Sequence, residues 1–156
     1  MNAVLLSLHV LAAIIAIGPV CVAASMFPAE ARRALDGETV GPESRLTVLA
    51  RISRVYAGVG IAVPVLGMMT AASMGLLAQP WVIVSMGITL AAALVLAFAV
   101  LPRQQSLLAD VAAQAGAGAA VRQKIARLGM VTGIFNLLWA TVTVLMIVRP
   151  GSTTGV

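Results

Sequence analysis

The sequence predicts an all-α integral membrane protein, a four-transmembrane-helix bundle made of two duplicated helical hairpins with pseudo-twofold symmetry. Three observations predict it: the composition, four uncharged spans and a basic motif that occurs twice. Of the 156 residues, 61% are hydrophobic and only 10% are charged, which lies outside the range of soluble globular domains. We therefore expect one transmembrane domain over residues 1–156.

Four stretches of the chain contain no Asp, Glu, Lys or Arg. They are residues 4–27, 56–77, 81–101 and 128–148. A bilayer hydrocarbon core is about 30 Å thick and a helix rises about 1.5 Å per residue, so each stretch is long enough to cross it. The first stretch has no basic residue before it, unlike a signal peptide, and we expect it to be retained as a transmembrane helix.

A short basic motif precedes the second and the fourth span. Residues 51–54 read Arg-Ile-Ser-Arg, and residues 124–127 read Lys-Ile-Ala-Arg. Pro28 and Pro102 close the spans that precede these motifs, at nearly the same distance from them. A repeated order of span, basic motif and span indicates duplicated hairpins, a common way of building small membrane proteins.

The loops within the two hairpins, residues 28–55 and 102–127, are expected to be helical extensions of the spans. Strong helix formers continue after the first span as far as Leu35. Pro42 is expected to begin the next helix, because a missing N–H costs nothing at the first helical position. In the second loop, the glycine-rich residues 116–118 predict the turn.

The basic residues predict the topology. Nine of the ten lie in these two loops, and the tenth is Arg149. By the positive-inside rule both loops are cytoplasmic and both termini lie outside a bacterial cytoplasmic membrane. The net charge of +5 then reflects topology, and we expect anionic lipid and no nucleic acid as a partner. The residues expected at the lipid headgroups are Arg32, Arg33, Arg51, Arg54, Arg103, Lys124 and Arg127.

Small residues on the second and fourth spans are expected to let helices approach closely, because lipid is as apolar as a helix surface and burial alone cannot drive association. This predicted packing set is Gly67, Ala71, Gly75, Gly129, Gly133 and Asn136. Pro64 is expected to kink the second span. An unpaired amide is costly in the membrane, so Asn136 is expected to bond across the bundle, with a ligand contact as the alternative.

His9 is the one residue in a span that could carry chemistry. The spans contain no carboxylate for a proton relay, and the chain has no Ser/His/Asp set and no spaced metal motif, so we predict no catalytic residues. Small residues follow His9 on its helical face, at Ala12, Ala13 and Ala16. This face could admit a flat macrocycle or another helix. Two roles stay open: a structural imidazole bonded to a backbone carbonyl, and a cofactor ligand.

Three methionines are expected at the same membrane depth as His9: Met74, Met86 and Met146. Thioether and imidazole ligands together suit Cu(I), and a methionine could also be an axial ligand of haem. Methionine is equally a common packing residue. The sequence leaves a metal site formed by His9 and these methionines as one hypothesis.

Several short motifs resemble a bacterial superfamily of small membrane proteins that includes HemJ-type protoporphyrinogen oxidases, CopD-like copper-resistance domains and an uncharacterised family. They are residues 8–13 with Gly18, residues 28–33, residues 54–56, Trp81, residues 135–136 and residues 148–150. The resemblance implies a four-helix membrane bundle, and it implies that His9 matches the histidine implicated in haem b binding.

The chain also departs from that superfamily. The polar His/Lys positions of the HemJ third helix have no counterpart in residues 81–101, and a single histidine rules out bis-histidine haem ligation within one chain. The greatest similarity is to the uncharacterised members, which we associate with actinobacteria. The resemblance therefore implies the fold more strongly than the reaction.

Three functions follow from these observations. The first is an accessory subunit without bound cofactor, which packs against other membrane protein subunits, for instance of a respiratory complex, or against itself. The second is a haem b- or Cu(I)-binding redox protein that uses His9. The third is a small-solute transporter or channel with Asn136 on its path. The absence of a catalytic set favours the first.

Overall fold

The computed structural model describes residues 2–37, 44–113 and 118–151. Within these ranges every regular element is helical, which confirms the predicted all-α class. In chain order the elements are α1 (Asn2–Leu35), α2 (Arg45–Val59), α3 (Ala62–Ser73), α4 (Pro80–Val95), a π-helical segment η1 (Leu96–Val100), α5 (Leu101–Ala112) and α6 (Ala119–Val148).

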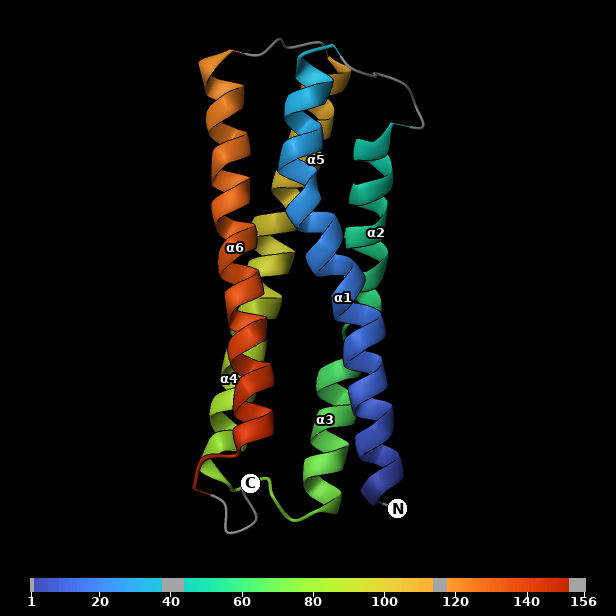
Figure 1. The fold of residues 1–156 in the computed structure, drawn as a ribbon, viewed down its shortest axis with the longest axis vertical. Helices are drawn as coiled ribbons and strands as arrows, with labels where there is room; N and C mark the ends of the chain where they lie inside the picture. Colours follow the sequence, from blue (N-terminus) through green and yellow to red (C-terminus); the bar gives the residue numbers. More distant parts are fainter. Residues whose placement is uncertain (1, 38–43, 114–117, 152–156) are drawn as a thin grey trace.

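These elements form four rods that are long and apolar enough to cross a membrane, counted over the described residues. The rods are α1, α2 with α3, α4 with η1 and α5, and α6, and they run antiparallel side by side (Figure 1). Asn2, the turn between α3 and α4, and the end of α6 lie at one end of the bundle, which we call the termini end. The opposite end, where α1 and α5 finish and α2 and α6 begin, is the loop end. The pseudo-twofold relation between the hairpins stays a prediction.

The helices extend beyond the apolar spans at the loop end. α1 continues past Pro28 to Leu35, and the Ser44 hydroxyl caps α2 by accepting a hydrogen bond from the backbone N–H of Thr47. The predicted helix start at Pro42 and most of the predicted turn at residues 116–118 lie outside the described residues. At the termini end, α3 stops at Ser73 rather than at residue 77, because Gly75 turns the chain with φ +68°.

The second rod is broken between α2 and α3, four residues before the predicted kink at Pro64. Pro64 has no N–H to donate to the carbonyl of Gly60, and its ring crowds that carbonyl. Around the break the backbone tightens: the N–H of Ile61 donates to the carbonyl of Gly58 at 3.2 Å, and the N–H of Val63 donates to that of Gly60 at 3.1 Å. Pro64 therefore breaks the helix about one turn before its own position.

The third rod stays continuous through Pro102 because the wider π-helical turn of η1 accommodates the proline ring. The N–H of Leu101 donates to the carbonyl of Leu96, five residues back, and this wider turn gives room for a ring that would clash in an α-helix. Arg103 Nη1 donates to the carbonyl oxygen of Ala99 at 2.7 Å. The guanidinium thus satisfies one carbonyl of the distorted segment.

The densest packing lies in the loop-end half and depends on small residues of α1. Ala24 and Ala31 are fully buried, and α1 lies against α2, α3 and α6. Larger side chains fill the space that these alanines leave, among them Phe135 of α6 and Phe27 of α1 itself. Close approach through small residues is the expected solution in lipid, although the predicted packing set lay on the second and fourth spans.

The structure divides the predicted packing set. Ala71 is buried, and a side chain at Gly129 would meet the Pro28 ring at 3.9 Å, an ordinary contact. A side chain at Gly75 or at Gly133 would meet open space. These two glycines therefore do not serve helix packing within the chain: the first is needed for its positive φ, and the second lies outside the buried face of its helix.

Candidate functional site

The single histidine lies on the membrane-spanning part of α1 and faces α3. His9 is 7% exposed, and its Nδ1 lies 3.0 Å from the carbonyl oxygen of Val63. A carbonyl oxygen only accepts, so Nδ1 carries the proton and donates it. In the neutral ring Nε2 then carries the lone pair, and it makes no hydrogen bond within the described part of the chain.

Gly67 makes the space that the imidazole occupies. A Cβ atom at this position would lie 2.8 Å from Cε1 and 3.3 Å from Nδ1 of His9, closer than a carbon atom can approach without a shift. Gly67 is one helical turn after Val63, so the carbonyl that accepts and the gap that admits the ring lie on one face of α3. Gly67 was predicted to serve helix packing, and in this structure the helix contact that it allows is the one with the His9 ring.

The donor chemistry of His9 suits a metal or haem iron, but the space around it does not. Metal-ligating histidines commonly donate Nδ1–H to a carbonyl and bind through Nε2, which is the arrangement present. The ring is nonetheless buried between α1 and α3, and the two best-formed cavities among the described residues lie at the loop end, away from it. As placed, His9 leaves no room for a macrocycle, and haem b does not fit.

The structure does not gather the three methionines around His9. Met74 follows α3, and seven helical residues put it about 10 Å beyond Gly67 along the helix axis. Met86 lies on α4 and Met146 on α6, and α4 packs mainly against α6. Among the described residues no group of three or more His, Cys, Asp or Glu side chains could hold a metal ion. The Cu(I) hypothesis stays a prediction, and its three methionines lie on or next to three different helices.

A second polar contact crosses the membrane interior between α6 and α1. Asn136 Nδ2 donates to the Ser25 hydroxyl at 2.9 Å, so the amide bonds across the bundle. Its Oδ1 is buried without a partner, as is the hydroxyl oxygen of Thr132 one turn earlier. Ser25 and Thr132 were not singled out in the sequence, because lone hydroxyl residues in an apolar span usually bond their own helix.

A third buried contact joins α5 to α2 near the loop end. Gln104 is 1% exposed, Ser53 is fully buried, and Gln104 Nε2 donates to the Ser53 hydroxyl at 3.2 Å. The sequence analysis did not predict this contact. The one signal for it was that Ser53 and Gln104 each lie next to an arginine, in stretches that keep an apolar stripe. These two residues hold the second and third rods together.

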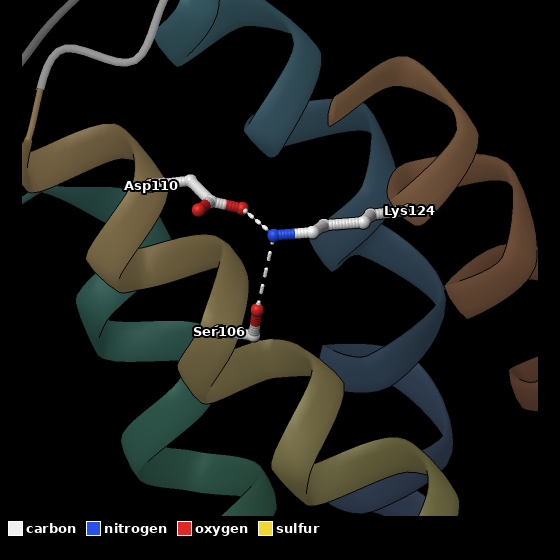
Figure 2. Close-up of polar contacts among 3 residues, drawn as sticks. All are labelled: Ser106, Asp110 and Lys124. Carbon is white, nitrogen blue, oxygen red and sulfur yellow. Dashed lines mark hydrogen bonds and ion pairs between the residues drawn. The ribbon is translucent and has the colours of Figure 1, made fainter. Parts of the chain in front are cut away.

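The predicted headgroup residues fall into two groups. Three are engaged by the protein: Lys124 bonds Asp110 at 2.7 Å and Ser106 at 3.4 Å (Figure 2), Arg33 pairs with Glu30, and Arg103 bonds the backbone. The side chains of the others make no hydrogen bond or ion pair within the described residues. They are Arg32, Arg51, Arg54 and Arg127.

Comparison with known proteins agrees with the membrane architecture. The model of the family described as "Predicted integral membrane protein (DUF2269)" matches residues 3–150. No curated protein matches the chain, and no solved structure matches it. The family match therefore covers all four rods and both of the loops that join them within the hairpins, and the expected likeness to an uncharacterised family of membrane proteins is met.

Proposed function

We propose, from the premise that the chain belongs to the DUF2269 family of predicted integral membrane proteins, that it is a non-catalytic accessory subunit. It resides in a bacterial plasma membrane with both termini outside, and it packs against a larger membrane complex, such as a respiratory complex. The positively charged loops support this orientation.

The observation that carries the proposal is the outer surface of α6. In its most apolar stretch only 17% of the residues are buried inside the chain, as in the rod of α2 and α3, against 28% for α1 and for the rod of α4, η1 and α5. A side chain at Gly133 would meet nothing within 4 Å, and Gly133 is exposed, one turn after Gly129. Small exposed residues let a neighbouring helix approach closely in a membrane, so α6 is the face that we assign to the partner.

The test compares two glycines with the same surroundings inside the chain. Gly133 of α6 and Gly87 of α4 both have open space where a side chain would lie. Tagged wild type, Gly133→Leu and Gly87→Leu are purified from native membranes in mild detergent, and the recovered proteins are quantified by mass spectrometry. We expect Gly133→Leu to lose most of a stoichiometric partner, because leucine holds the helices apart, and Gly87→Leu to retain it.

Two results would count against the proposal. The wild type could be recovered alone under several mild conditions, or the two variants could lose the same partner equally. The absorption spectrum of the same wild-type sample tests the conclusion that haem b does not fit at His9. A Soret band that His9→Ala abolishes would show that the site opens for haem, and it would favour a redox function.

A further inference from the structure

A cavity of about 180 Å³ lies at the loop end between the last turn of α1 and the first turns of α6. Its lining residues are Arg32, Leu35 and Asp36 from the first hairpin and Arg122 and Ile125 from the second. Residues more than 80 positions apart in the chain thus form one site. Two arginines and one aspartate line it, so the site carries a net positive charge.

The chemistry of this lining suits a phosphate group. Guanidinium presents a planar fork of donors that matches phosphate oxygens in pairs, which an ammonium does not. The Arg32 side chain makes no hydrogen bond or ion pair within the described residues, so its guanidinium donors are not consumed by the protein there. Leu35 and Ile125 supply an apolar wall, and Asp36 can accept a hydrogen bond from a hydroxyl or ammonium group next to the phosphate.

The position of the cavity relative to the membrane indicates whether a lipid or a soluble compound supplies that phosphate. Arg32 lies five residues beyond the apolar span that ends at Phe27, and Arg122 lies six residues before the span that begins at Leu128. At about 1.5 Å per residue both arginines are about 7–9 Å outside the hydrocarbon core. The headgroup layer extends roughly 5–8 Å from the core on each side, so the cavity opens at or just beyond the lipid phosphates.

We infer that this cavity is a binding site for a phosphodiester headgroup, in which Arg32 and Arg122 hold the phosphate and Asp36 accepts a hydrogen bond from the headgroup's hydroxyl or ammonium group. Phosphatidylglycerol has the full set of matching groups: one negative phosphate, hydroxyl donors and an apolar portion. Surface arginines such as Arg127 attract anionic lipid without this enclosure.

The experiment measures lipid binding by native mass spectrometry of the full chain in detergent, titrated with phosphatidylglycerol. We expect Arg32→Gln and Arg122→Gln each to weaken the apparent Kd at least tenfold. Arg127→Gln, which removes an exposed arginine of α6 that does not line the cavity, is expected to change it less than twofold. Leu35→Trp fills the cavity without altering charge, and it is expected to weaken binding as the arginine variants do.

The remaining outcomes each decide a part of the inference. Equal losses from Arg32→Gln and Arg127→Gln, or wild-type binding by a correctly folded Leu35→Trp, would overturn the site, because the lipid would then follow surface charge alone. Glycerol 3-phosphate and inorganic phosphate serve as competitors. Displacement of the lipid by either at equal concentration would assign the site to a soluble phosphate compound and overturn the membrane source, while resistance to both supports the lipid.

Discussion

At the scale of single residues, the imidazole of His9 is held by the backbone of α3 and by the absence of a side chain there. Its hydrogen bond goes to the carbonyl of Val63, and its ring lies where a Cβ of residue 67 would be. A buried polar group in a membrane is stable only when it is bonded. Val63 therefore satisfies the Nδ1–H of the imidazole and Gly67 admits the ring, while Nε2 makes no hydrogen bond within the described residues.

Gly67→Ala tests this arrangement. The added Cβ would lie 2.8 Å from the ring, so the helices must separate or the ring must leave its carbonyl, and overpacking of this kind costs about 1–3 kcal/mol. We expect a lower free energy of unfolding in a denaturing-detergent titration. The control is Gly87→Ala, where a Cβ meets nothing within 4 Å.

A double-mutant cycle separates the histidine from general effects of the alanine. In a His9→Ala background the clash partner is gone, and Gly67→Ala should then cost much less than it does beside the histidine. Equal costs in both backgrounds would show that residue 67 is constrained by something other than the imidazole.

At the scale of elements, each hairpin has one irregular rod, and a proline causes the irregularity in each. Pro64 breaks the second rod at residues 60–61, whereas Pro102 leaves the third rod continuous through η1. The two sites differ in how the backbone N–H and C=O groups near the proline are hydrogen-bonded. Near Pro64 tightened turns bond them, and near Pro102 a hydrogen bond across five residues and the side chain of Arg103 do so. π-helical turns inside α-helices occur often at functional positions.

The contact of α5 with α6 at the loop end gives a prediction about charge. Lys124 Nζ lies 2.7 Å from Asp110 Oδ2, with the two side chains 47% and 22% exposed. Ion pairs this exposed contribute at most about 1 kcal/mol and are screened by salt. Lys124→Gln is therefore expected to lower the free energy of unfolding by no more than that, and 1 M salt should remove the difference.

The control is Arg127→Gln, because Arg127 is exposed and its side chain has no partner among the described residues. A large, salt-independent loss of stability in Lys124→Gln would contradict a pair that salt screens.

At the scale of the whole molecule, the bundle is packed unevenly along its length. The core cluster lies mostly from the middle of the bundle to the loop end, where all four rods meet, while at the termini end α3 contacts α1 closely and α4 only slightly. Exposed apolar side chains follow the termini half of α1, including Leu11, Ile14 and Ile15. In a membrane these face lipid or another subunit.

The proposed orientation makes a prediction for the intact cell. In a Cys21→Ala background, Gly151→Cys at the termini end should react with a membrane-impermeant thiol reagent in whole cells, because the proposal places both termini outside. Gln123→Cys, exposed on α6 at the loop end, should react only after the membrane is opened. Labelling in the opposite order would reverse the topology, and it would leave the bundle itself unchanged.

The sequence by itself determined the class of the protein, because four uncharged apolar stretches of this length leave a helix as the stable state in a bilayer. It also predicted the helical extension beyond Pro28 and the cross-bundle bond of Asn136, since helix propensity and the cost of an unpaired amide are local properties. It also assigned helix packing to Gly133, where a side chain would meet nothing within 4 Å inside the chain. The metal site formed by His9 and the methionines stays a hypothesis.

Only the tertiary structure decided which faces meet. Val63 and Gly67 around His9, Ser53 beside Gln104, and the cavity between Arg32 and Arg122 all join residues that are distant in the chain. Helix period restricts a residue to a face, but in lipid the apolar faces of different helices are nearly equivalent. The rotation and the pairing of the rods are then set by steric fit between particular side chains, which no single segment of sequence contains.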